Sequence, residues 1–128
     1  MLSYVIITVS ILALTTPEAK AQDVSAGEAS FRKCQPCHDV GENARNKVGP
    51  KLNGLEGRKS GTIEDYSYSE ANKNANITWS AASFKDYIAD PREKMPGTKM
   101  IFPGIKNEKE AEDLWAYLSQ FKPEGTKK

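Results

Sequence analysis

The chain's two cysteines and its single histidine lie within five consecutive positions, as Cys34, Cys37 and His38 in the segment "FRKCQPCH". Cysteines three positions apart are separated by about one helical turn, so their side chains face the same way. Followed directly by a histidine, the pair is typical of a site where two thiols add to the vinyl groups of a haem and the histidine binds the iron. The sequence therefore predicts one covalent haem c, attached through Cys34 and Cys37, with His38 as an iron ligand.

Other chemistries also use closely spaced cysteines. A plain disulfide and a thioredoxin-like redox pair share the Cys-x-x-Cys spacing, but the redox pair belongs near a βαβ pattern. No alternating strand pattern is visible in this sequence. A structural zinc site needs four Cys or His ligands, and the chain has three. The haem interpretation is therefore favoured.

The sixth iron ligand cannot be a second histidine, because the chain has only one. Apart from Met1, the thioethers are Met95 and Met100. Methionine commonly fills gaps in cores, so packing is the alternative for either residue. Met100 ends the segment "PGTKM", whose proline and glycine form a turn able to present it to the iron. Met95 precedes a proline and is expected to pack, which makes Met100 the predicted ligand.

The N-terminal segment differs in character from the rest of the chain. An apolar run of 11 residues extends from Tyr4 to Leu14, and an Ala-Lys-Ala site precedes Gln22. This pattern predicts a secretory signal peptide at residues 1–21, cleaved before Gln22. The run is shorter than the roughly 20 residues of a membrane span. We expect a periplasmic domain at residues 22–128, without stable membrane insertion.

Composition is consistent with one compact domain of 128 residues. The charges nearly balance, with 18 Lys and Arg against 17 Asp and Glu, so the basic surface expected of a nucleic-acid-binding protein is missing. Without the predicted signal peptide, 36 of the remaining 107 residues are hydrophobic, or 34%. This is a small supply for the core of a domain that buries only about two thirds of its surface. A prosthetic group at the centre would compensate.

The elements that must position these groups are helices joined by long loops. Ser25, with Glu28 three residues on, predicts a capping box and a first helix that runs into the cysteine pair. Asn107 predicts the cap of a last helix, whose apolar stripe continues until Pro123.

A third helix is predicted from Ser80 to the Asp-Pro pair at position 90, and a shorter one at residues 69–73. Residues 39–68 and 91–104 are predicted to be loops, which are reasonable at this length if they wrap a large group. We expect an all-α, single-domain fold.

Four segments together resemble class I cytochromes c, with the greatest similarity to the bacterial cytochromes c2: "GEASFRKCQPCH", "KVGPKLNGLEGRKSG", "YSYSEANKNANITW" and "DPREKMPGTKMIFPGIK". The resemblance extends over residues 22–121. It implies the cytochrome c fold, in which the N- and C-terminal helices pack together and loops wrap one covalent haem.

The resemblance also implies roles for single residues. The carbonyl of Pro50 would accept a hydrogen bond from His38, which fixes the ring and raises its basicity. Four residues would surround the haem propionates: Arg58, Tyr68, Trp79 and Thr98. Two would form a polar group near the sixth ligand: Asn72 and Tyr87. Without the resemblance, ordinary core packing would explain the aromatic residues equally well.

The predicted function is that of a soluble periplasmic one-electron carrier and not of an enzyme. Its haem would cycle between ferrous and ferric iron. The expected partners are membrane-bound respiratory or photosynthetic complexes, with a bc1-type donor and an oxidase, reaction centre or reductase as acceptor. We expect a monomer that docks through lysines near the haem edge: Lys33, Lys47, Lys94, Lys99 and Lys106.

The alternative function is a haem enzyme, or a sensor of a gas or peroxide, whose sixth iron position opens. The loop methionine in "PGTKM" argues against it. An adaptor module would not need the haem site at all.

Overall fold

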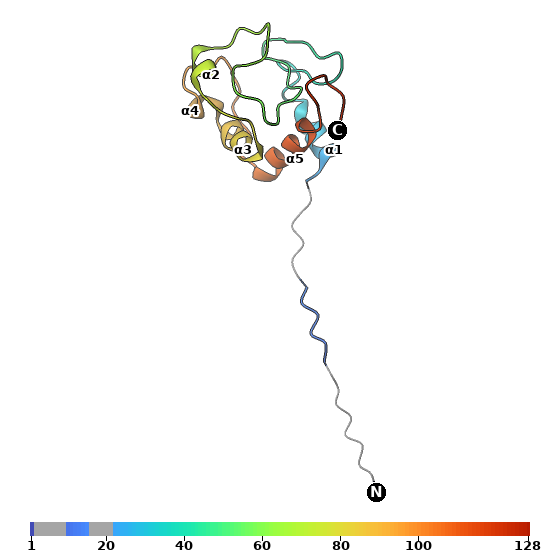
Figure 1. The fold of residues 1–128 in the computed structure, drawn as a ribbon. Coiled ribbons are helices and arrows are strands. Elements are labelled where there is room, and N and C mark those ends of the chain that lie inside the picture. The colour runs from blue at the N-terminus through green and yellow to red at the C-terminus, as the bar shows by residue number, and fades with distance from the viewer. Residues whose placement is uncertain (2–9, 16–21) are drawn as a thin grey trace.

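The computed structural model describes residue 1, residues 10–15 and residues 22–128. The predicted cleavage site, Ala19 to Ala21, lies outside the described residues. Within them the structure has five helices in the order α1 (Val24–Phe31), α2 (Glu70–Asn74), α3 (Ala81–Ala89), α4 (Pro91–Lys94) and α5 (Glu108–Leu118) (Figure 1). The described part has two isolated β-bridges and no strand, which confirms the all-α prediction. No helix in it has the length and apolarity needed to cross a membrane.

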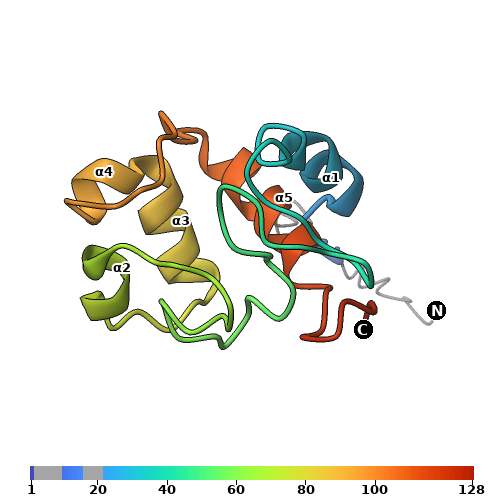
Figure 2. The same ribbon diagram turned by 90° about the horizontal axis from the view of Figure 1, so that it is seen from above.

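The N- and C-terminal helices pack against each other, as predicted. α1 lies beside α5 in both views, and α3 lies between α5 and the short helices α2 and α4 (Figures 1 and 2). The rings of Phe31 and Tyr117 meet at 5.5 Å between centroids. Leu114 of α5 is fully buried. This pair of helices forms the base on which the remaining chain is arranged.

The predicted start of α1 is wrong by two residues. Its N-cap is Asp23, whose side chain accepts a hydrogen bond from the Ala26 amide at 3.0 Å. The predicted cap, Ser25, lies inside the helix. The Asp23 amide donates to the Asp113 carboxylate of α5 at 2.8 Å. This contact between helices fixes the backbone at Asp23, and local sequence rules do not include it.

Two further helix starts agree with the sequence. Ser80 caps α3 through a reciprocal capping box with Ser83, and Ser69 caps α2 by accepting from the Asn72 amide at 3.1 Å. Asp90 ends α3 as expected, but it also caps α4. The prediction of an uninterrupted loop at residues 91–104 is therefore wrong. Proline fits the first position of a helix, where no amide hydrogen is needed.

The last helix begins as predicted and ends early. The Asn107 side chain accepts from the Glu110 amide at 2.9 Å, but α5 ends at Leu118 rather than near Pro123. Phe121 forms a bridge with Lys127, and its ring packs edge-on against Tyr117 at 5.3 Å between centroids. The apolar stripe thus continues into a turn outside the helix.

The long loop at residues 39–68 has no helix. Hydrogen bonds from a buried side chain and between backbone groups hold it in place. The buried Asn53 amide accepts from the Gly41 N–H at 2.9 Å and donates to the Gly41 carbonyl at 2.8 Å. The Gly57 amide donates to the Trp79 carbonyl at 2.8 Å, and the Trp79 amide donates to the Arg58 carbonyl at 2.9 Å. These bonds satisfy backbone groups that regular structure would otherwise pair.

Candidate haem site

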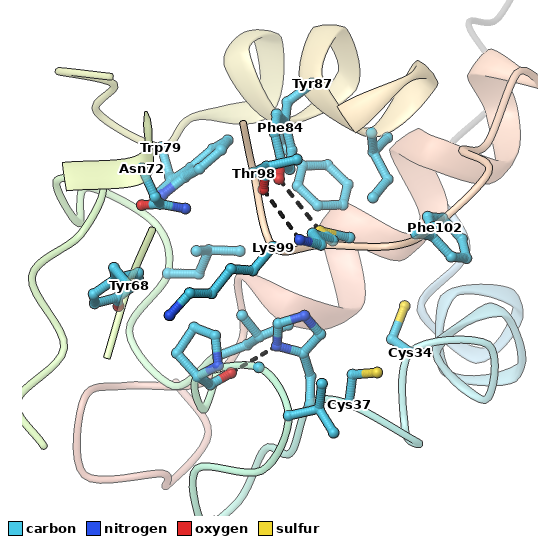
Figure 3. Close-up of a pocket in the computed structure, with 18 of the residues that line it drawn as sticks. Cys34, Cys37, Tyr68, Asn72, Trp79, Phe84, Tyr87, Thr98, Lys99 and Phe102 are labelled. Carbon is cyan, nitrogen blue, oxygen red and sulfur yellow. Dashed lines mark hydrogen bonds between the residues drawn. The ribbon is translucent and has the colours of Figure 1, made fainter. Parts of the chain in front are cut away.

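A cavity of about 360 Å³ lies between the helices and the loops. This is within the range of small-molecule and cofactor sites. Cys34 and Cys37 lie on one side of it, and Trp79, Tyr87 and Thr98 on the opposite side (Figure 3). All the predicted site residues line it: Cys34, Cys37, His38, Pro50, Arg58, Tyr68, Asn72, Trp79, Tyr87, Thr98 and Met100.

The cysteine segment is a tight continuation of α1. The Cys34 amide donates to the Phe31 carbonyl at 2.8 Å, and the His38 amide donates to the Cys34 carbonyl at 2.8 Å. These helix-like bonds bring both thiols and the imidazole to the same cavity. The attachment chemistry expected of this segment therefore depends on local backbone geometry.

The His38 ring is held by the chain segment opposite it. Its Nδ1 lies 2.6 Å from the carbonyl oxygen of Pro50. The neighbouring Gly49 leaves room for the ring, since a Cβ there would lie 2.4 Å from the ring carbon Cε1. Burial lowers the pKa of the imidazole, although its bond to Pro50 raises it. The second ring nitrogen, Nε2, is the one that would bind the predicted iron.

The predicted sixth ligand is also held by named contacts. The Tyr87 hydroxyl donates to the Met100 sulfur at 3.3 Å, and the Met100 amide donates to the Thr98 hydroxyl at 3.2 Å (Figure 3). A turn precedes it, closed by the bond from the Thr98 amide to Met95 at 3.0 Å. Met95 is 3% exposed and packs in the apolar core. Met100 lines the cavity and Met95 does not.

The remaining predicted residues line the cavity, and each is held by a different partner. The Arg58 guanidinium donates to the carbonyl of Lys51 at 3.0 Å, and burial lowers its pKa. The Tyr68 hydroxyl accepts from the Ile63 amide at 3.1 Å. Trp79 packs edge-on against Tyr87 at 5.1 Å between ring centroids. Their contact with haem propionates stays a prediction.

The residues present fit a haem. The Asn72 amide oxygen is buried without a hydrogen-bond partner among the described residues, although Asn72 lines the cavity. A buried polar group without a partner is costly, so the occupant should supply one. The unpaired oxygen is an acceptor and needs a donor, which an ionised carboxylate cannot supply, whereas the amide nitrogen of Asn72 is a donor and can serve a carboxylate. Nitrogen from His38 and sulfur from Met100 are ligands that haem iron accepts.

The thiols argue against redox-pair chemistry. Both cysteines are free. Burial raises the pKa of Cys34 to about 11, whereas reactive cysteine pairs have lowered pKa values. Within the described residues no group of three or more Cys, His, Asp or Glu side chains could hold a metal ion.

The predicted docking lysines do not form one uniform patch. Lys33 and Lys99 line the cavity, whereas Lys47 donates to the Gln35 carbonyl at 3.0 Å. Three of the five pair with carboxylates: Lys33 with Glu110, Lys94 with Asp86 and Lys106 with Asp90. Such exposed pairs contribute little to stability, but they reduce the positive charge that each lysine presents.

Sequence reasoning missed part of the site. Tyr66 lines the cavity and donates to the Val48 carbonyl at 2.6 Å. The apolar part of the lining comes from two leucines of the long loop, Leu52 and Leu55, and from four residues of the predicted helices: Phe84, Ile88, Leu114 and Leu118. Periodicity identifies the helical residues as buried, but it does not distinguish a cavity wall from a closed core, and it says nothing of the two loop leucines.

A Cys-x-x-Cys-His segment facing a loop methionine across one cavity of an all-α fold defines a c-type haem protein. The family model for cytochrome c matches residues 24–122. A cytochrome c2 of Rhodoplanes tepidamans is 71% identical over 107 residues, 84% of this chain and 100% of that protein. Cytochrome c-550 of Nitrobacter winogradskyi is 59% identical over 103 residues, 80% of this chain and 94% of that protein.

Among solved structures, cytochrome cH from Methylobacterium extorquens is similar with a TM-score of 0.70 and 44% identity. The similarity covers 75% of this chain and 96% of that chain. The chain belongs to the cytochrome c family. It is an electron carrier with a covalent haem c and not an enzyme, which confirms the predictions for cofactor and function class.

Proposed function

We propose that this cytochrome c carries electrons in the periplasm, with His38 and Met100 as the two axial ligands of its haem iron. The observation that carries this proposal is that both side chains line one cavity and that each has a hydrogen-bonding support: Pro50 for His38 and Tyr87 for Met100. The haem supplies one-electron chemistry when bound. The chain would supply attachment, ligands and exclusion of water.

The contributions of the chain are mainly positional. Pro50 holds the His38 ring in one orientation, and Tyr87 and Thr98 hold Met100 on the other side of the cavity. A ligand set held before and after electron transfer keeps the reorganisation of the site small. The buried aromatic pair of Trp79 and Tyr87 limits access of water from that side. A carrier needs these properties, since nothing has to bind to its iron.

The proposed partners are a bc1-type donor and an oxidase, reaction centre or reductase as acceptor. Cytochromes c2 are among the relatives of this chain, which supports a place in a membrane-linked electron-transfer chain. These partners would contact the protein at the cavity rim near Lys33 and Lys99.

Maturation can be checked by mass. We expect the purified periplasmic protein to begin at Gln22 and to weigh as residues 22–128 plus one haem that survives denaturation. The relative from Rhodoplanes tepidamans aligns over 107 residues along its whole length. The present chain also has 107 residues from Gln22 to its end. Intact mass spectrometry and N-terminal sequencing test both points.

The two readouts fail separately. A product without covalent haem would contradict the site, whereas a haem protein that keeps residues 1–21 would contradict only the cleaved, soluble form. Cys34→Ser and Cys37→Ser should each yield a haem joined by one thioether or none.

Docking can be checked by ionic strength. The formal net charge is only +1, so steering must come from a local patch. We expect electron transfer to the true partner to slow as salt rises. Lys99→Gln should lower the rate about threefold to tenfold at low salt. Stopped-flow kinetics measures the rate.

A matched control is Lys85→Gln. Lys85 pairs with Glu112 and does not line the cavity, so its loss should leave the rate unchanged. A wild-type rate that stays flat from low to high salt would refute the lysine patch.

A further inference from the structure

The peptide group between Pro50 and Lys51 is hydrogen-bonded at both of its polar atoms. Its carbonyl oxygen lies 2.6 Å from Nδ1 of His38. Its N–H donates to the side-chain oxygen of Asn46 at 2.9 Å. A peptide group is planar. Fixing the N–H therefore also fixes the direction of the carbonyl that meets His38.

Asn46 is well placed to hold this group. Its side-chain nitrogen donates to the Glu64 carbonyl at 3.4 Å, so the amide bridges two parts of the loop at residues 39–68. The residue is half-buried. At the next peptide group, the Lys51 carbonyl accepts from the Arg58 guanidinium at 3.0 Å. The segment that presents Pro50 to His38 is thus held by side chains on both sides.

Asn46 should affect the strength of the His38 bond as well as its direction. A hydrogen bond accepted from a peptide N–H polarises the group, and chains of hydrogen bonds strengthen one another by about 10–30% per bond. A stronger acceptor at Nδ1 makes a ligating imidazole more basic. A more basic ligand favours ferric over ferrous iron, because second-shell hydrogen bonds tune haem potentials.

We propose that Asn46 is a positioning residue that acts through the Pro50 carbonyl on His38 and so lowers the reduction potential of the haem. This inference rests on the proposed ligation by His38. It concerns a residue that does not line the cavity.

The test is Asn46→Ala in the mature haem protein. We expect the reduction potential to rise and the ring N–H proton of His38 to exchange with solvent at least tenfold faster by NMR. The absorption that reports sulfur ligation should remain. The sign is informative, because general loosening that releases Met100 would remove that absorption and lower the potential.

Asn53→Ala is the matched control. It removes an asparagine from the same loop and breaks two bonds to Gly41, but it touches neither the Pro50 peptide nor the cavity. We expect lower stability and an unchanged potential. Asn46→Asp keeps an acceptor oxygen and loses the donor to Glu64, so its potential should not rise. If the alanine variant does not fold, Asn46→Gln displaces the acceptor and should raise the potential.

Three results would overturn the inference: an unchanged potential in Asn46→Ala or, should it not fold, in Asn46→Gln; an equal rise in Asn53→Ala; or a rise in Asn46→Asp. Each can occur while wild-type protein still shows covalent haem and sulfur ligation. Failure of this inference is therefore distinguishable from failure of the proposed function, which the wild-type mass and spectrum test.

Discussion

Met100→Ala should remove the iron–sulfur charge-transfer absorption of the ferric protein and lower its reduction potential. A thioether favours ferrous iron, whereas a water or amine that replaces it favours ferric iron. The fall should be a substantial part of the about 0.8 V range that axial ligands span in haem proteins. Cyanide and carbon monoxide should also bind rapidly, since truncation opens the place that the Met100 sulfur occupies beside the Tyr87 hydroxyl. Absorption spectra, redox titration and ligand-binding kinetics measure the three effects.

Met95→Leu is the control for this change. Met95 is 3% exposed and lies in the apolar core. Exchange for leucine conserves volume and should cost less than about 1.5 kcal/mol. The charge-transfer absorption should remain. Rapid binding of carbon monoxide to reduced wild-type protein would contradict a closed iron site and favour the alternative of an enzyme or sensor.

Gly27→Ala should destabilise the protein strongly, although alanine favours a helix by about 1 kcal/mol over glycine. An added Cβ would lie 1.9 Å from the Asp113 carbonyl oxygen and 2.9 Å from the Cβ of Tyr117. Backbone cannot move aside as a flexible side chain can, so α1 must separate from α5. Overpacking of this kind costs about 3 kcal/mol, equivalent to a fall in the melting temperature of roughly 10 °C or more. Calorimetry of the haem protein measures it.

Gly57→Ala is the comparison that isolates the clash. The added Cβ meets nothing within 4 Å, but the backbone φ of +81° strains any residue with a side chain. That strain should cost about 1–2 kcal/mol. Equal losses for the two variants would contradict the claim that close approach of α1 and α5 depends on Gly27.

Part of the site could be predicted from the sequence because it depends only on residues close together in the chain. Cys34, Cys37 and His38 lie within one turn, and the bond from the His38 amide to the Cys34 carbonyl brings them together without any distant contact. The caps at Ser80 and Asn107 also act over three residues. Such interactions do not depend on the rest of the chain. They could therefore be predicted directly from the residues next to one another in the sequence.

The prediction for the start of α1 failed because of a distant contact. Asp23 rather than Ser25 caps α1 because Asp113, 90 positions away, binds the Asp23 amide. The resemblance to class I cytochromes c suggested the Pro50 contact, but no sequence pattern pointed to Asn46 behind it. An asparagine in a loop fits many turns equally well. Only the folded loop shows which backbone group it binds.

By itself, the sequence determined the cofactor and its attachment, since the chemistry of Cys34, Cys37 and His38 needs only their spacing. It also limited the second ligand to two methionines. The tertiary structure shows that Met100 lies on the cavity wall, 62 positions beyond His38, and Met95 in the core, which supports the proposed ligation by Met100. It also decided which lysines are paired with carboxylates. The reason is that ligation across a cavity and ion pairing depend on distances between segments, and packing of the whole chain fixes those distances.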